Sequence, residues 1–279
     1  MVNIFSVDLE DWYHANYNRD AENGSEGVES IIPRNVVKIL DLLDKNGSKC
    51  TFFVLGKVAG KFKDILKDIA ARGHEIASHG FDHKLVYSQT EKEFREDVRR
   101  AKGTLEEIVR KEVKGYRAPS WSITDRSLWA LPILLEEGYR YDSSIFPTQN
   151  FMYGIKNAPR FAHVHNLVNG NLLEVPPSTV RFCGTNIPFS GGFYFRVCPE
   201  FMIKAFSRIV NRSGYPTVFY LHPREIDICQ PRLELTFKNR FIHYAGIKNC
   251  LKKLASVMSA FPATSIEIFY GKFFRENVL

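Results

Sequence analysis

The chain has 279 residues, of which 44% are hydrophobic and 25% are charged, a composition that excludes disordered and fibrous proteins. A chain of this length buries enough surface to need neither disulfides nor a structural metal for stability. The chain has 38 lysine and arginine residues against 31 aspartate and glutamate residues, a net charge of +7 that is spread along the sequence. Such a diffuse charge indicates a solvated surface rather than a nucleic-acid-binding protein. It would also suit an anionic saccharide, a lipid-linked substrate or an acidic membrane face.

Short apolar runs alternate with longer segments of helical period along the chain. This alternation is typical of a parallel sheet with helical crossovers, so we expect an α/β fold, with a barrel of seven or eight strands as first choice and an open sheet as second. The expected strands are residues 2–7, 49–55, 75–78, 113–117, 140–142, 171–175 and 217–221. The expected helices are residues 36–43, 61–71, 90–109, 127–137 and 245–259.

Unusual polar residues stand at one end of five of these strands. They are Asp8, His79, Arg117, Asp142 and His222. In a parallel sheet the C-terminal strand ends all emerge on the same face, which is where α/β proteins hold their active sites. The sequence therefore predicts one site at this face.

Two histidines four residues apart, His79 and His83, follow the third expected strand. If the segment forms a helical turn, both imidazoles converge on one cation. The first strand is followed by Asp8, Glu10 and Asp11, and charges beside a buried run are costly unless something binds them. Two imidazoles and one carboxylate, with a position left open for water, form the pattern of a catalytic zinc site. The alternatives are two surface histidines and a helix that collects acids at its start.

Residues around these groups suggest a cleft. Trp12 follows the acids and indicates a cleft wall, and Arg117 is followed by a turn that Pro119 stiffens and by Trp121. An arginine that emerges from an apolar strand needs a carboxylate partner, and Asp8 is the candidate. The alternative is a surface arginine beside a tryptophan that only packs. His222 precedes a proline that ends the strand, which would place the ring at the rim of the cleft; the alternative is a hydrogen-bonded core histidine.

The cysteines and the first residues bear on the compartment. The five cysteines are odd in number, scattered and free of Cys-x-x-Cys pairs, which predicts reduced thiols. The apolar stretch that begins at Met1 is too short for a signal peptide, and no later segment approaches the roughly 18 apolar residues of a membrane-spanning helix. We therefore expect a cytoplasmic protein.

Five segments that carry the polar residues named above occur in the same order as the sequence blocks of the polysaccharide deacetylase family and resemble them. This family is also called the NodB-homology or carbohydrate esterase family 4 domain. The resemblance covers residues 1–230, and residues 190–195 and 221–244 are similar to the subgroup found in exopolysaccharide and surface-glycan gene clusters. The blocks are Asp8-x-Glu10-Asp11-Trp12, Ser78-His79-x-x-x-His83, Arg117-Ala-Pro119-Ser-Trp121, Tyr141-Asp142-Ser143-Ser144 and Leu221-His222-Pro223.

The resemblance implies a distorted (β/α)7-type barrel in a single domain over residues 1–230, with residues 231–279 as a C-terminal extension that packs on it. It also implies one divalent metal ion, usually Zn²⁺, held by His79, His83 and a carboxylate. The family's adjacent Asp-Asp pair is here Asp8-Leu9, so the carboxylate is Glu10 or Asp11. We favour Glu10, because residues two apart in an extended chain point to the same side.

The other roles that the resemblance implies are assigned residue by residue. Asp8 resembles the catalytic base, Arg117 the residue that orients it, and His222 the general acid. Asp142 resembles the acid that supports the histidine side of the site. The groove that receives the substrate would be lined by Trp121, Pro119 and Trp12.

The function expected from the resemblance is removal of N-acetyl groups from a polysaccharide or glycan precursor by a metal-dependent hydrolase. One alternative is hydrolysis of a small non-sugar amide, and another is a glycan-binding protein that has lost its metal. The expected partner is an N-acetylated saccharide, with no nucleic acid and with the oligomeric state left open. Weak membrane-surface association would use the basic face of the last expected helix, including Lys248, Lys252 and Lys253.

Overall fold

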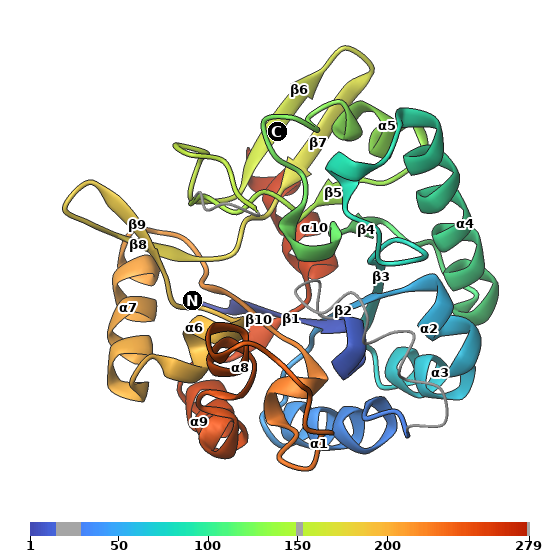
Figure 1. Ribbon diagram of the computed structural model, residues 1–279. Coiled ribbons are helices and arrows are strands. Elements are labelled where there is room, and N and C mark those ends of the chain that lie inside the picture. Colours follow the sequence, from blue (N-terminus) through green and yellow to red (C-terminus); the bar gives the residue numbers. More distant parts are fainter. Residues whose placement is uncertain (15–28, 149–152, 278–279) are drawn as a thin grey trace.

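A curled β-sheet forms the centre of the structure, and helices pack around its outer side (Figure 1). The computed structural model describes residues 1–14, 29–148 and 153–277. The strands follow the order β10-β1-β2-β3-β4-β5-β7-β6, and β11 pairs with β1. Neighbouring strands are parallel except β6 and β7, which are antiparallel.

All seven expected strands are present, most of them with shorter bounds than predicted. The sheet consists of β1 (Asn3–Leu9), β2 (Thr51–Val54), β3 (Glu75–Ser78), β4 (Gly115–Tyr116), β5 (Tyr141–Asp142), β6 (His163–Leu167), β7 (Gly170–Glu174), β10 (Val218–Leu221) and β11 (Ala263–Thr264). A separate antiparallel hairpin consists of β8 (Thr179–Phe182) and β9 (Thr185–Pro188). The sequence did not predict β6 or this hairpin.

The chain between β7 and β10 curls the sheet toward a barrel. The amide of Ser178 donates to the carbonyl oxygen of Val218 over 3.3 Å, and the amide of Tyr220 donates to the carbonyl oxygen of Ser190 over 3.2 Å. These bonds tie the segment that follows β7 to the strand at the opposite end of the sheet. The predicted α/β class with a distorted, barrel-like sheet is confirmed.

All five expected helices are present; the one expected at 61–71 begins after Phe62, and a short helix that was not predicted ends just before it at Lys61. The helix at residues 90–109 begins with a capping box, in which Thr90 accepts from the amide of Glu93. The helices are α1 (Ile32–Lys45), α2 (Gly56–Lys61), α3 (Lys63–Ala71), α4 (Glu91–Val109), α5 (Ala130–Glu136), α6 (Gly192–Val197), α7 (Glu200–Arg212), α8 (Phe237–Tyr244), α9 (Ile247–Ala260) and α10 (Ile266–Asn277).

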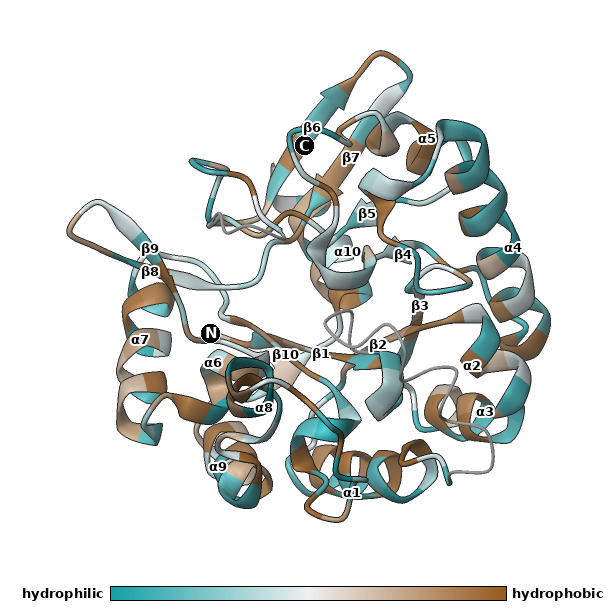
Figure 2. Cartoon of the chain, viewed as in Figure 1, coloured by the Kyte–Doolittle hydropathy of each residue, from teal (hydrophilic) through white to brown (hydrophobic). Residues whose placement is uncertain are grey.

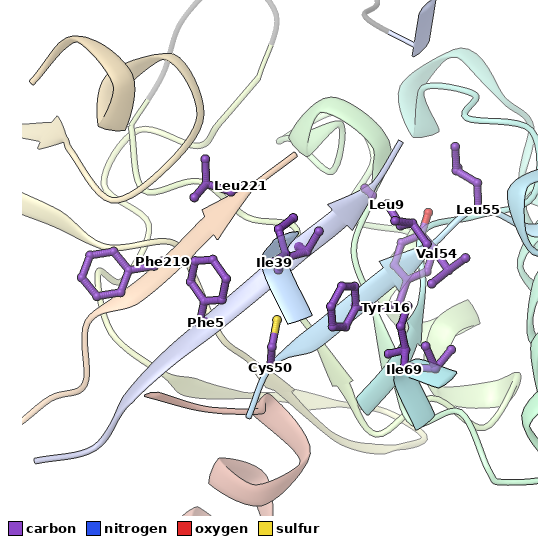
Figure 3. Packing of buried hydrophobic residues seen from close by; sticks show 14 of the residues in the cluster. Phe5, Leu9, Ile39, Cys50, Val54, Leu55, Ile69, Tyr116, Phe219 and Leu221 are labelled. Carbon is purple, nitrogen blue, oxygen red and sulfur yellow. The ribbon is translucent and has the colours of Figure 1, made fainter. Parts of the chain in front are cut away.

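The main hydrophobic core lies between the outer side of the sheet and the helices. Figure 3 shows Phe5 of β1 and Phe219 of β10 on the sheet, and Ile39 on α1. The helices are amphipathic, with hydrophilic residues on the solvent side of α1 and α4 (Figure 2). Burying each large apolar side chain contributes roughly 1.5–3 kcal/mol, so this layer supplies the main stabilisation of the fold.

The inner side of the sheet has an apolar floor and a polar mouth. On the inner face of β1, Ile4 belongs to a small apolar core at the floor. Ser6 and Asp8 lie on the same face nearer the mouth and contact the buried Arg117. At the floor, Ile266 of α10 joins Ile4, Phe53, Tyr141 and others in that inner core. The N-terminal half of α10 therefore closes the end of the sheet opposite the candidate site.

A buried glutamate, Glu75, fixes α10 to the floor. Its carboxylate accepts from the hydroxyl groups of Thr51 (2.5 Å) and Tyr141 (2.6 Å) and from the amide of Glu267 (2.8 Å). Burial raises the pKa of Glu75 to about 7, although the three hydrogen bonds oppose this shift.

Two further features concern the cysteines and the helices. The five cysteines are all free, and Cys50 and Cys250 are buried. Among the helices of the described ranges, none combines the length and apolar character that a bilayer crossing requires.

Candidate active site

Glu10, His79 and His83 converge just beyond the C-terminal ends of β1 and β3. One carboxylate oxygen of Glu10 lies 2.8 Å from Nε2 of His79 and 2.9 Å from Nε2 of His83. One ligand atom from each residue lies within 4.8 Å of the others, and all three side chains are buried. The sequence predicted this juxtaposition.

The hydrogen bonds of His79 show how this cluster fits a metal ion. Its Nδ1 lies 2.7 Å from the carbonyl oxygen of Arg117, so the neutral ring carries its proton on Nδ1 and turns the lone pair of Nε2 toward Glu10. A lone pair and a carboxylate repel each other unless a proton or a cation lies between them. Two imidazoles and one carboxylate, with a second partner orienting an imidazole, are a donor set that suits a divalent metal such as zinc.

The charge state of Glu10 agrees with this arrangement. Burial alone would raise the pKa of Glu10, but the positive charge that His83 and His222 can carry, together with the close contacts of the His79 and His83 imidazoles, lowers the pKa well below its ordinary value. The carboxylate is therefore available as a ligand near neutral pH.

The segment that carries both histidines is a loop, and the helical turn expected there is wrong. Gly80 and His83 have φ values of 78° and 57°, in the left-handed region. Asp97 of α4 holds the loop, since its carboxylate accepts from the amides of Phe81 (2.8 Å) and Asp82 (3.3 Å). A Cβ atom at position 80 would lie 2.9 Å from Asp97, so only glycine fits there without a shift.

Of the two candidate carboxylates, the structure brings Glu10 to the imidazoles and turns Asp11 away from them. One oxygen of Asp11 accepts from the amides of Trp12 (3.0 Å) and Ile31 (3.2 Å). Asp11 thus ties the end of β1 to the start of α1.

Asp8 and Arg117 form a buried ion pair beside this cluster, as predicted. Nη1 of Arg117 lies 2.6 Å from Asp8 and also donates to the hydroxyl oxygen of Ser6 over 2.8 Å. The other guanidinium nitrogens donate to the carbonyl oxygen (3.1 Å) and the hydroxyl oxygen (2.8 Å) of Ser143. The guanidinium is fully buried and lies 4.7 Å from the centre of the Trp121 ring. These contacts fix the position of Asp8 through a rigid cation.

His222 lies at the opposite side of Asp8. Its Nε2 is 3.6 Å from Asp8, and its Nδ1 is 3.4 Å from Glu225. Burial alone would lower the pKa of His222, but the carboxylates of Glu10 and Glu225 outweigh burial and raise it. Sequence reasoning missed Glu225, although an acid three residues after His222 has the spacing of a capping box.

Asp142 belongs to a buried pair of acids with Glu174. The hydroxyl of Ser144 donates to Asp142, and the amide of Ala118 donates to the oxygen of Ser144 over 2.8 Å. Burial raises the pKa of Asp142 to about 6 and that of Glu174 well above its ordinary value, so both carboxyl groups favour the protonated form more than an exposed acid does. Through Ser144, Asp142 thus supports the backbone next to Arg117. The predicted role of Asp142 in supporting the histidine side of the site stays a prediction.

The two tryptophans expected to line the groove are buried, and so is Phe146 beside Trp121. Trp12 and Trp121 are 3% and 7% exposed, and Phe146 is 1% exposed. Trp121 packs edge-on against Phe146 with 5.3 Å between the ring centres, and it follows Pro119 in a strained loop where Ser120 and Trp121 both have positive φ. The prediction that Trp12, Pro119 and Trp121 bind substrate stays a prediction.

The sequence did not place His14 near the site, and it placed Lys253 on a face where the structure does not leave its ammonium group free. His14 lies beside the cluster, with its ring centre 5.6 Å from that of His83, and burial lowers its pKa to about 3. Lys253 is not part of an exposed basic face, because its ammonium donates to the carbonyl oxygens of Phe195, Arg196 and Cys198.

Two sequence families match the chain. Residues 23–140 match the family described as "Polysaccharide deacetylase", and residues 143–270 match one described as "Domain of unknown function (DUF3473)". A peptidoglycan-N-acetylglucosamine deacetylase of Bacillus cereus is 36% identical over 94 residues. This match takes in 33% of the chain and 34% of the relative, so the chain aligns with about a third of that protein.

Solved structures are similar over nearly the whole chain. A candidate polysaccharide deacetylase from Mycobacterium smegmatis superimposes with a TM-score of 0.63 at 20% identity, covering 100% of this chain and 93% of that one. PuuE allantoinase superimposes with a TM-score of 0.62 at 16% identity, covering 98% and 90%. At these identities the likeness concerns the fold, and it agrees with the α/β barrel architecture described above.

Proposed function

Because the chain belongs to the polysaccharide deacetylase family, we propose that it is a metal-dependent hydrolase that removes an N-acetyl group from a saccharide. The observation that carries this proposal is the placement of two imidazoles on one carboxylate, Glu10, next to a second carboxylate, Asp8, that a buried arginine holds. This arrangement separates a metal-binding carboxylate from one that is free to accept a proton.

Glu10, His79 and His83 would hold the metal, and zinc is the ion that we propose. When bound, such an ion supplies Lewis acidity, which polarises an amide carbonyl and lowers the pKa of water toward about 7. The hydrogen bond from Nδ1 of His79 to Arg117 orients the ring for this ligation.

Asp8 is the proposed base that takes a proton from the attacking water. Its carboxylate follows the same face of β1 as Glu10, two residues earlier, so a water that reaches the Glu10 cluster lies near Asp8. The bond to Arg117 keeps one oxygen of Asp8 fixed and stabilises the negative charge of the carboxylate.

His222 is the proposed acid that protonates the leaving amine. It lies within 3.6 Å of Asp8 and is 12% exposed, so it lies between the proposed base and solvent. The carboxylate of Glu225 on its far side favours the protonated imidazole that this role requires.

The test is acetate release from N-acetylglucosamine oligomers by wild-type protein and by Asp8→Asn. We expect Asp8→Asn to lower turnover by about 100-fold or more while zinc content stays normal, because it removes the base and keeps the ligands. Asp64→Asn, on the exposed face of α3, serves as the matched control. Near-normal turnover of Asp8→Asn would show that Asp8 is not the base. The proposed activity would be overturned if the wild-type protein released no acetate from any N-acetylated saccharide.

The same assay separates the alternatives. Turnover of a small non-sugar amide alone would favour the amidohydrolase, and saccharide binding that persists in chelator without bound metal would favour the glycan-binding protein. We further propose that the enzyme acts in the cytoplasm on a glycan precursor and associates weakly with the membrane surface. Cell fractionation and sedimentation with anionic liposomes test these two statements.

A further inference from the structure

A basic pocket lies outside the candidate active site, between residues 147–148 and 156–161 on one side and the β8–β9 hairpin on the other. Its volume is about 840 Å³. Three of its lining residues are cations, Lys156, Arg160 and Arg181, and the described residues that line it include no aspartate or glutamate. A hollow of this size with one sign of charge concentrates anions.

No aspartate or glutamate among the described residues forms an ion pair with any of the three cations. In the described ranges, Lys156 and Arg181 have no hydrogen-bond or ion-pair partner. Arg160 is held in place by Thr179, which accepts from its Nε (3.3 Å) and, through the carbonyl oxygen, from its Nη2 (2.7 Å). Burial and the nearby charge of Arg181 lower the pKa of Arg160. The fold therefore holds like charges together, and an anion would relieve their repulsion.

One face of the hairpin forms the wall of this pocket. Arg181 and Asn186 are cross-strand partners and so point to the same side, and Asn186 donates to the carbonyl oxygen of Pro147 over 2.6 Å. The opposite face carries Phe182 and Ile187, which are 66% and 38% exposed. Figure 1 shows the hairpin projecting from the edge of the barrel. Its polar face thus lies toward the pocket.

Both walls of the pocket leave the sheet at C-terminal strand ends, as the residues of the candidate active site do. The two walls follow the C-terminal ends of β5 and β7, and the Glu10 cluster follows the C-terminal ends of β1 and β3. The connection is also direct, because Pro147 follows Phe146, whose ring packs against Trp121, and Trp121 covers the guanidinium of Arg117.

We propose that this pocket binds an anionic group carried by a saccharide, either a phosphate or a carboxylate, while another part of the same saccharide reaches the deacetylation site. The link to deacetylation rests on the proposed function. Both anions offer oxygen atoms in the geometry that a guanidinium recognises with two hydrogen bonds, and no described residue accepts a hydrogen bond from the guanidinium of Arg181.

The first test is direct binding by calorimetry, with inorganic phosphate, glucuronate and neutral glucose as probes for the full chain. We expect at least one anion to bind, glucose not to bind, and the Lys156→Ala/Arg181→Ala double variant to weaken anion binding about tenfold or more. Arg212→Ala, an exposed arginine at the end of α7, should bind as the wild type does. Binding of phosphate alone indicates a phosphorylated carrier, and binding of glucuronate alone indicates an acidic sugar.

The proposal is overturned if neither anion binds, or if Arg212→Ala weakens binding as much as the double variant does. A circular-dichroism melting curve of each variant ensures that the comparison is made between folded proteins.

The second test separates this proposal from the proposed function. Arg181→Ala should raise the ratio of KM for an acidic N-acetylated oligosaccharide to KM for a neutral one, about tenfold, and Arg212→Ala should leave the ratio unchanged. Anion binding lost in the double variant, without acetate release from any saccharide, supports the pocket and overturns the proposed function. Acetate release from neutral oligomers without anion binding supports the proposed function and overturns the anion-binding pocket.

Discussion

The inner side of the sheet holds a buried glutamate at each end, Glu10 at the mouth and Glu75 at the floor. Glu75 accepts hydrogen bonds from two hydroxyl groups and one amide, and its pKa is raised to about 7. Glu10 faces two imidazoles, and its pKa is lowered well below the ordinary value. The same residue type is thus partly neutral and structural at the floor, but charged and ready to bind a cation at the mouth. Partners rather than burial set this difference.

The largest expected effect comes from neutralising the glutamate at the mouth. Glu10→Gln keeps the shape but removes the ligand charge, so we expect metal affinity and turnover both to fall more than about 100-fold. Zinc per chain and acetate release measure the two effects. Asp11→Asn is the control, since it alters a neighbouring carboxylate that holds backbone amides instead. A Glu10→Gln enzyme with full metal content would contradict the assignment.

The matching change at the floor should act on stability and its pH dependence. Because the folded pKa of Glu75 lies above its ordinary value of 4.5, its contribution to stability is fully present below pH 4.5 and is lost as pH rises to about 7. The loss is up to about 3 kcal/mol, on the order of 1.4 kcal/mol for each pH unit. Glu75→Gln should remove this dependence, as urea unfolding at pH 5 and pH 8 would show. Equal slopes in both proteins would contradict the shift.

A smaller effect tests whether a carboxylate at the mouth also tunes its histidine. Glu225 raises the pKa of His222, so Glu225→Gln should lower it and move the alkaline limb of the activity profile to lower pH. The expected loss at alkaline pH is about tenfold, below the roughly 100- to 10,000-fold of complete acid–base catalysis. The pH dependence of acetate release gives the answer, with His222→Gln as the reference that abolishes the limb. An unmoved limb would separate Glu225 from the reaction.

The smallest effect concerns the loop that presents the histidines. Asp97→Asn keeps one acceptor for the amides of Phe81 and Asp82 but loses the charge, so metal affinity should fall by about tenfold or less. Competition with a chromogenic chelator measures this affinity, and Asp68→Asn on α3 is the control. A change as large as that of Glu10→Gln would mean that Asp97 does more than hold the loop.

Much of the fold follows from local pattern. The strand β1 is an apolar run that ends in acids, and its alternation correctly placed Asp8 and Glu10 on one side. The strand β6 escaped prediction because His163, His165 and Asn166 give it a polar, half-exposed composition. Exposed Phe182 and Arg181 gave the hairpin no core-facing alternation to recognise.

The site was predictable where one residue type demands a partner, and not where contacts depend on distant packing. A buried arginine requires a carboxylate, which identified Asp8 as the partner of Arg117. Asp97 looks like an ordinary residue of a helix surface until the loop at Gly80 folds back on it. The burial of Trp121 likewise depends on Phe146, which lies 25 positions later, so the sequence alone could not show that the fold buries this ring.

The position of β1 has a consequence for the order in which the chain folds. This first strand pairs with residues 51–54 of β2, which follow soon in the chain. It also pairs with residues 218–221 of β10 and 263–264 of β11, which come much later. Such long sequence separations raise the contact order and slow folding, because loop closure must precede the contacts that reward it. During synthesis, one edge of the first strand stays unpaired until more than two hundred further residues have left the ribosome. The floor is completed later still, when β11 and α10 arrive, so a nascent chain exposes an open sheet edge through most of its synthesis and is a natural client for chaperones.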